Sequence, residues 1–284
     1  MLTSVVRYMN MARLEVRPWI WSLWILLYLS AFAPGRAIAL ALLSFISFQT
    51  LKEYFSIMPM RQAERPVLLL GYLTIPIQYG LVALEQSALP FVFIPLFIAL
   101  LSVIGWRKYG ATPQTLNSTV KIGWGVFTLV FLFSHLGLLL VRPLPEELGV
   151  TGESLSLYLL LVVNVQIAVQ LSLTRLGVNE WSRLMPGVLP LSLTGPLSIL
   201  AAGVVGLSLG PWLTAFSRQT ALWASLMVGA SAYLGNATLR ALFHMLETSE
   251  DERLIPGLGG ILTFLYPLVY AAPLFFYMYH ILYG

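Results

Sequence analysis

The chain contains no cysteine, a single aspartate and few charged residues of any kind. The absence of cysteine from all 284 positions excludes disulfides, thiolate metal sites and a cysteine nucleophile. Because Asp251 is the only aspartate, a cluster of aspartates that binds two metal ions cannot form. Charged residues make up 10% and hydrophobic residues 58% of the chain, against about 25% and about 45–50% in soluble domains. This composition predicts a membrane protein.

Long apolar stretches fill most of the chain, and about 20 apolar residues in a helix cross the hydrocarbon core of a bilayer. The candidate segments are 18–34, 36–51, 67–85, 88–106, 119–141, 154–174, 188–209, 219–246 and 260–283. We therefore predict an all-α integral membrane protein, with one transmembrane domain over 1–284 and a bundle of about nine helices. The second segment is short and is predicted to form a hairpin with the first. Residues 1–16 carry Arg7 and Arg13 and are predicted to form a retained interfacial helix.

The basic residues lie scattered between the apolar segments, without the interleaved aromatic residues of a nucleic-acid surface. No nucleic-acid partner is predicted. With the N-terminus in the cytoplasm, twelve basic residues fall on the inner side and three, Arg36, Arg142 and Arg218, on the outer side. This asymmetry predicts a bacterial inner-membrane protein with a cytoplasmic N-terminus. The odd number of predicted segments then places the C-terminus outside.

Polar residues within the apolar segments are candidates for function, because an unpaired polar group is unfavourable in hydrocarbon. They are His135 in the fifth segment, Asn164, Gln166 and Gln170 in the sixth, and Asn236, Arg240 and His244 in the eighth. The last three are spaced four residues apart and so share one helix face. This stripe either lines a cavity or forms hydrogen bonds between helices. His135 has no acid nearby in the sequence, and a packing role is favoured over a ligand role.

Glycines and acids gather before the last segment. Gly257, Gly259 and Gly260 permit close approach of the backbone to a ligand or to another helix. The spacing matches neither a dinucleotide-binding motif nor a P-loop, so a plain turn into the last helix is the alternative. The acids that could hold a cation are Glu247, Glu250, Asp251 and Glu252, and no metal site is predicted.

The segment GNATLRALFHMLETSEDERLIPGLGGILTFLYPLVYAAPLFFY resembles the end of the phosphatidate cytidylyltransferase family, the CDP-diacylglycerol synthases. Residues 219–284 are the most family-like part, and a weaker resemblance continues upstream through Lys52, Glu53 and Tyr54 and through Ser134 and His135. The resemblance implies a polytopic helical fold. In an intact family member it also implies Mg²⁺-dependent transfer of a cytidylyl group from CTP to phosphatidate.

The chain departs from this family where the chemistry is done. Asn236 replaces an aspartate, Phe243 and His244 a Lys-Arg pair, Leu258 a histidine, and Thr263, Phe264, Leu265 and Tyr266 an Asp-Arg-x-Asp quartet. Upstream, Ser192 and Gly195 replace a lysine and a glutamate. We therefore predict a non-catalytic member without cofactor, which binds a membrane phospholipid, a partner enzyme of lipid metabolism or a second copy of itself. The candidate ligand-binding residues are Asn236, Arg240, His244, Gly257, Gly259, Gly260 and Ser192.

Two other functions stay open. An active phospholipid-modifying transferase would use Arg240, His244 and the acidic loop in place of the lost residues, and would depend on Mg²⁺ and a nucleotide. A lipid transporter is favoured by prolines and polar residues within the segments and disfavoured by the lack of an internal repeat. Flux of labelled lipid across liposomes would separate the transporter from the other two.

Overall fold

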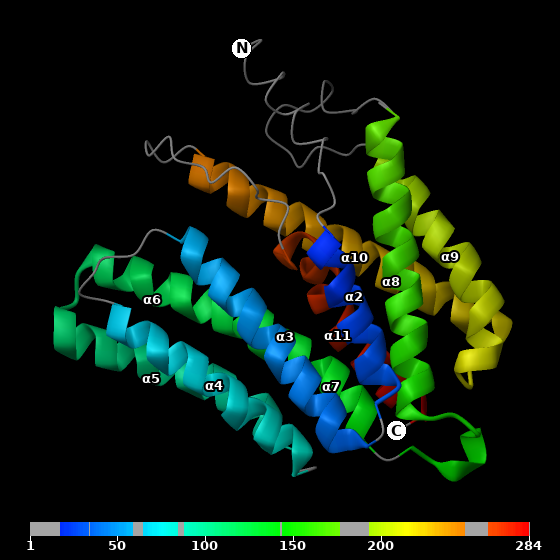
Figure 1. Ribbon diagram of the computed structural model, residues 1–284, viewed down its shortest axis with the longest axis horizontal. Helices are drawn as coiled ribbons and strands as arrows, with labels where there is room; N and C mark the ends of the chain where they lie inside the picture. Colours follow the sequence, from blue (N-terminus) through cyan, green and yellow to red (C-terminus); the bar gives the residue numbers. More distant parts are fainter. Residues whose placement is uncertain are drawn as a thin grey trace. The chain divides into compact units, whose positions relative to one another are not determined.

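A computed structural model describes residues 18–33, 35–58, 65–84, 88–142, 144–176, 193–247 and 261–283, which hold helices and no strand (Figure 1). The elements are α2 (Pro18–Ala31), α3 (Arg36–Ile57), α4 (Arg65–Ala83), α5 (Leu89–Tyr109), α6 (Pro113–Val126), the π-helical turn η2 (Phe127–Leu132), α7 (Phe133–Val141), the 3-10 turn η3 (Glu146–Leu148), α8 (Gly152–Arg175), α9 (Thr194–Leu213), α10 (Arg218–Glu247) and α11 (Ile261–Tyr283). The all-α prediction is confirmed for this part of the chain. Residues 1–16, predicted to be interfacial, lie outside the described residues.

The helices are those of an integral membrane protein. Within the described ranges, six helical runs are long and apolar enough to cross a bilayer: Arg36–Ile57, Leu89–Tyr109, Pro113–Val141, Gly152–Thr174, Thr194–Leu213 and Ile261–Tyr283. A shorter apolar helix covers Val67–Ala83. Every predicted segment overlaps a helix, but α2 has only 14 residues, fewer than the about 20 that span a bilayer. The number of crossings therefore stays a prediction.

The end of the second predicted segment is wrong. The predicted segment ended at residue 51, whereas α3 continues to Ile57. Within this last turn Lys52 is exposed and Tyr54 and Phe55 are buried. The helix continues because the Lys52 side chain projects away from the packed face. Its long aliphatic part can carry the ammonium group to a polar environment.

The described helices belong to two compact units. One comprises Met1–Ile25 and Leu157–Phe275, and the other comprises Leu26–Ser156 and Phe276–Gly284. Each unit is therefore assembled from segments that are far apart in the sequence. The prediction of one transmembrane domain stays a prediction.

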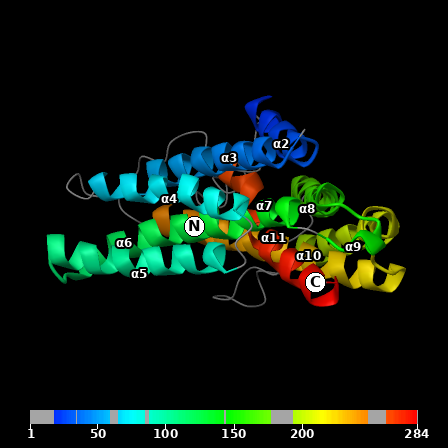
Figure 2. The same cartoon turned by 90° about the horizontal axis from the view of Figure 1, so that it is seen from below.

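In the first unit, α9 lies against the first part of α10 (Figures 1 and 2). Gly206 and Gly210, one turn apart on α9, meet Ser225 and Ala221, also one turn apart on α10, so closely that a Cβ atom at either glycine would overlap them. Small residues at this spacing let two membrane helices approach. Tyr158 of α8 donates to the Ala221 carbonyl at 3.1 Å, so this unit brings three helices together.

In the second unit, α3 lies beside α4, and α5 lies beside α6 (Figures 1 and 2). Polar side chains join these helices at depth. Gln78 Nε2 on α4 donates to the Pro90 carbonyl on α5 and to Ser134 Oγ on α7, both at 2.9 Å. Tyr54 on α3 donates to the Lys121 carbonyl on α6 at 2.9 Å. These bonds satisfy polar groups that would otherwise face hydrocarbon.

Candidate functional site

Four neutral side chains of the first unit form a hydrogen-bonded group, named here the amide cluster: Gln166, Gln170, Ser198 and Asn236. Gln166 Nε2 donates to Gln170 Oε1 at 2.9 Å and to Ser198 Oγ at 3.2 Å. Asn236 Nδ2 donates to the same Gln170 oxygen at 2.8 Å. The cluster therefore joins α8, α9 and α10 through side chains that are separated widely in the sequence.

The positions of these side chains follow from their helices. Gln166 and Gln170 are one turn apart on α8, so both project from one face, and they are 0% and 2% exposed. Ser198 lies in the first turns of α9, and its hydroxyl donates to the Gly195 carbonyl at 2.8 Å. A Cβ atom at Gly195 would lie 2.7 Å from the Tyr233 ring. This glycine lets the start of α9 approach α10 one turn before Asn236.

The amide cluster keeps one acceptor and one donor unused. Within the part of the chain that the structure describes, Gln166 Oε1 and Gln170 Nε2 are buried and have no hydrogen-bond partner. A buried polar atom without a partner is unfavourable by about 1–3 kcal/mol. A carbonyl and a hydroxyl of a bound molecule would satisfy both atoms. Because amides and hydroxyls do not titrate near neutral pH, this cluster can hold and orient a polar group but cannot move its protons.

The structure describes two of the three side chains in the predicted polar stripe of α10. Asn236 is half-buried and bonded to Gln170, which supports the interpretation as a contact between helices. Arg240 is exposed one turn further along. His244 belongs to α10, but its side chain is outside the described part of the structure, as are Ser192, Gly257, Gly259 and Gly260. Ser198 was missed, although a hydroxyl within an apolar helix is the kind of signal that identified Gln166 and Gln170.

The residues that the sequence comparison aligned with the Asp-Arg-x-Asp quartet of phosphatidate cytidylyltransferases pack into the core. Phe264, Leu265 and Tyr266 of α11 are buried. A Cβ atom at Gly235 would lie 2.5 Å from the Tyr266 carbonyl oxygen and 3.0 Å from Pro267 Cα, so the backbones of α10 and α11 meet here. Apolar residues at these positions remove the need to bury charge at a close contact.

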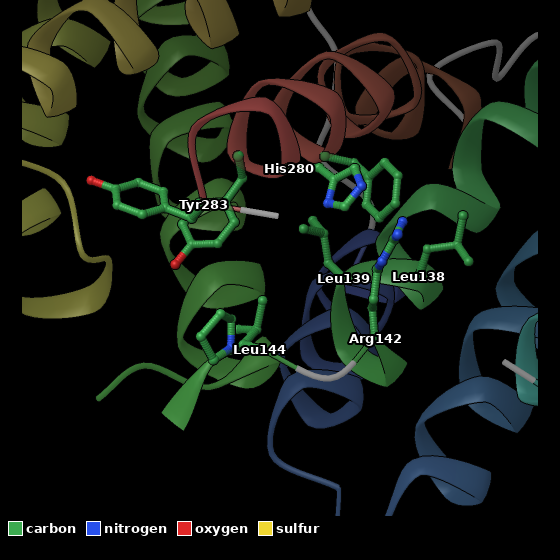
Figure 3. A pocket seen from close by; sticks show the side chains of 9 residues that line it. Leu138, Leu139, Arg142, Leu144, His280 and Tyr283 are labelled. Carbon is green, nitrogen blue, oxygen red and sulfur yellow. The ribbon is translucent and has the colours of Figure 1, made fainter. Parts of the chain in front are cut away.

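The second unit holds a cavity of about 400 Å³ where α7 and α11 end (Figure 3). Its lining comprises Leu138, Leu139, Arg142, Leu144, Pro145, Phe276, Tyr279, His280 and Tyr283. None of these residues was identified as a candidate from the sequence, where Arg142 was counted only as an external charge. A basic residue at the end of one apolar segment and a histidine at the end of another were the available signals.

Comparison with known proteins shows a similarity that extends over nearly the whole chain, and it gives no information on the cavity or the amide cluster. No protein-family model matches the chain. The chain is 31% identical over 266 residues to the uncharacterized protein YnbB of Escherichia coli (strain K12), and the match covers 93% of the chain and 86% of that protein. Similarity at this level over nearly the full length of both proteins shows that they belong to one protein family. The chain therefore belongs to the same protein family as YnbB of Escherichia coli.

Proposed function

We propose that this integral membrane protein binds a phospholipid, without changing it chemically, on the face of α10 that holds Asn236 and Arg240. The observation that carries the proposal is the hydrogen bond between Asn236 and Gln170. It connects the polar stripe of α10 to a buried cluster with an unused donor and an unused acceptor. Gln170 Nε2 can donate to an ester carbonyl of a lipid, and Gln166 Oε1 can accept from a hydroxyl.

The charge on this face suits a phospholipid. Arg240 lies four residues after Asn236, about 6 Å along the helix axis, and is exposed. In a glycerophospholipid the phosphate is attached to the same glycerol that carries the acyl esters, so the two groups lie close together. The Arg240 guanidinium can therefore bind the phosphate through charged hydrogen bonds, while the amide cluster holds the ester region.

The resemblance to phosphatidate cytidylyltransferases supports both halves of the proposal. It favours a phospholipid ligand, and it identifies the positions where an intact enzyme supplies charge. Asn236, Phe243 and Tyr266 occupy three of these positions and supply none. Transfer of a cytidylyl group needs charges that stabilise the transferring phosphate, so binding without turnover is the function that we propose.

The test compares lipid binding by single-residue variants. Full-length protein is purified, stripped of lipid in detergent and titrated with phosphatidylglycerol, and bound lipid is measured by native mass spectrometry. Arg240→Gln should weaken binding by roughly tenfold, because a hydrogen bond to a charged group contributes about 1.5–3 kcal/mol. Arg218→Gln removes the same charge from the first residue of α10 and should have little effect.

A second arm tests the absence of turnover. The same protein is incubated with Mg²⁺, CTP and phosphatidate, and no CDP-diacylglycerol should form above a control with empty membranes. Equal binding by the Arg240→Gln and Arg218→Gln proteins would contradict the lipid site. Product above the control would show that the protein is an active transferase.

We also propose that the protein lies in a bacterial cytoplasmic membrane with its N-terminus inside and its C-terminus outside. The twelve-to-three distribution of basic residues supports this orientation. Alkaline phosphatase fused after Gly284 should be active, and green fluorescent protein fused there should be dark. A fluorescent C-terminal fusion would show that the orientation or the number of crossings is wrong.

A further inference from the structure

We propose that the cavity at the ends of α7 and α11, named here the Arg142 cavity, binds a phosphate group, carried by a lipid headgroup or free in solution. Its residues belong to the second unit and share none with the α10 face. The proposal is independent of the function proposed above, and it concerns a second site.

Two nitrogen-bearing side chains from different helices meet in this cavity. Arg142 directly follows α7, and its half-buried guanidinium carbon lies 5.7 Å above the Phe276 ring. The His280 ring is stacked on the same phenylalanine, with 6.2 Å between centroids and 22° between planes. Figure 3 shows Arg142 and His280 extending toward the same space. A guanidinium offers several N–H donors in a fixed fork, and an imidazole offers at least one more, which is the donor set that a phosphate accepts.

The charges around the Arg142 cavity favour an anion. No carboxylate is among the lining residues that the structure describes, and the side chain of Glu147, five residues after Arg142, is exposed. A cation at the end of α7 also interacts favourably with the helix dipole, which explains why an arginine is tolerated there. The dipole does not explain why His280, 138 positions later in the sequence, is placed beside it over one ring.

The remaining wall is apolar and aromatic. Leu138, Leu139 and Leu144 line it together with the rings of Tyr279 and Tyr283, whose centroids lie 5.2 Å apart. The volume of about 400 Å³ is near the lower end of the range for small-molecule sites, about 300–1,000 Å³. This size fits a phosphate with an attached glycerol, and the apolar wall fits the start of an acyl chain.

Phe276 also packs edge to face against the buried ring of His135. The two ring centroids lie 5.5 Å apart, and Phe91, Phe131 and Tyr277 surround the same histidine at 5.1–5.7 Å. His135 Nδ1 lies 3.0 Å from the Phe131 carbonyl oxygen, and because a carbonyl only accepts, Nδ1 must carry the proton. His135 is thus a positioning residue: it fixes the Phe276 ring, against which Arg142 and His280 pack.

Binding is measured by calorimetry on the full-length protein in phosphatidylcholine nanodiscs, with three separate probes. They are inorganic phosphate, short-chain phosphatidylglycerol and short-chain phosphatidylcholine. We expect saturable binding of at least one of the two anionic probes and at least tenfold weaker binding of the zwitterionic lipid. Preference for phosphatidylglycerol over phosphate would identify a lipid headgroup as the ligand, and equal affinity would identify the phosphate itself.

Variants assign the binding to the Arg142 cavity. Arg142→Gln should raise the dissociation constant by roughly tenfold or more, since it removes charged hydrogen bonds. Arg142→Lys should raise it less. His280→Asn should raise it severalfold and serves as the second test if Arg142→Gln does not fold. Arg218→Gln, whose side chain belongs to neither proposed site, should bind these probes as the wild type does. Arg240→Gln should leave the binding of inorganic phosphate to the Arg142 cavity unchanged, and it should lower only the separate phosphatidylglycerol binding of the α10 face. Wild-type affinity in the folded Arg142→Gln or His280→Asn protein, or no binding of either anionic probe, would overturn the proposal.

Discussion

Replacing Gly235 with valine is expected to remove most of the folded protein from the membrane. A Cβ atom at this position would lie 2.5 Å from the Tyr266 carbonyl oxygen and 3.0 Å from Pro267 Cα. Both are backbone atoms of α11, so no change of rotamer can relieve the overlap, and the two helices must separate. Ser231, one turn earlier on α10, donates to the Tyr270 carbonyl at 2.8 Å and would lose its acceptor. We expect destabilisation by about 3 kcal/mol or more.

The measurement is the yield of monodisperse protein after extraction, together with its thermal unfolding temperature. Gly80→Val is the matched control, because no heavy atom of a packed neighbour among the described residues lies within 4 Å of a Cβ atom built at Gly80 in α4. It should leave stability within about 1 kcal/mol of the wild type. A Gly235→Val protein as stable as the Gly80→Val protein would show that α10 and α11 do not meet at this position.

Asn236→Asp should destabilise the protein by about 2 kcal/mol, although it restores the residue of the family that the sequence resembles. Asn236 donates to Gln170 Oε1, and an ionised carboxylate can only accept, so two acceptors would face each other. Rotating the Gln170 amide would present its nitrogen to the carboxylate. That rotation would remove the acceptor of Gln166 Nε2, so the amide cluster would still lose one hydrogen bond.

Thermal unfolding of the purified variant, with and without Mg²⁺, measures this effect. Asn236→Leu removes the same hydrogen bond without adding charge, so the difference between the two variants isolates the carboxylate. Addition of Mg²⁺ should not restore stability to Asn236→Asp. Wild-type stability, or stabilisation by Mg²⁺ alone, would show that the position still accepts a metal ligand and would contradict the proposal of a non-catalytic protein.

Hydropathy predicted the helices well because burial in lipid is a property of each segment by itself. Every predicted segment overlaps a helix, and the errors lie at polar ends. The fifth segment was predicted from residue 119, whereas α6 begins at Pro113 with Thr112 as its cap, whose side chain accepts from the Thr115 amide. Polar first turns carry no hydropathy signal, although a threonine followed by proline indicates a helix start.

The candidate site could be predicted only one residue at a time. A polar group within an apolar helix is conspicuous in any sequence, and Gln166, Gln170 and Asn236 were identified for that reason. The sequence does not show that Asn236 donates to Gln170, 66 residues away. Ser198 was missed because a serine can satisfy its hydroxyl on its own helix, and only its bond to Gln166 sets it apart.

By itself the sequence determined that this is a helical membrane protein without thiol chemistry or an aspartate-based metal centre, because composition and apolar length need no knowledge of contacts. Only the tertiary structure decided which polar groups meet. His135, for which the sequence favoured a packing role, is enclosed by aromatic rings. Arg142 and His280 became a candidate site because the ends of two distant helices place both against Phe276. The pairing of distant side chains depends on how helices pack, and the local pattern of a sequence does not contain that information.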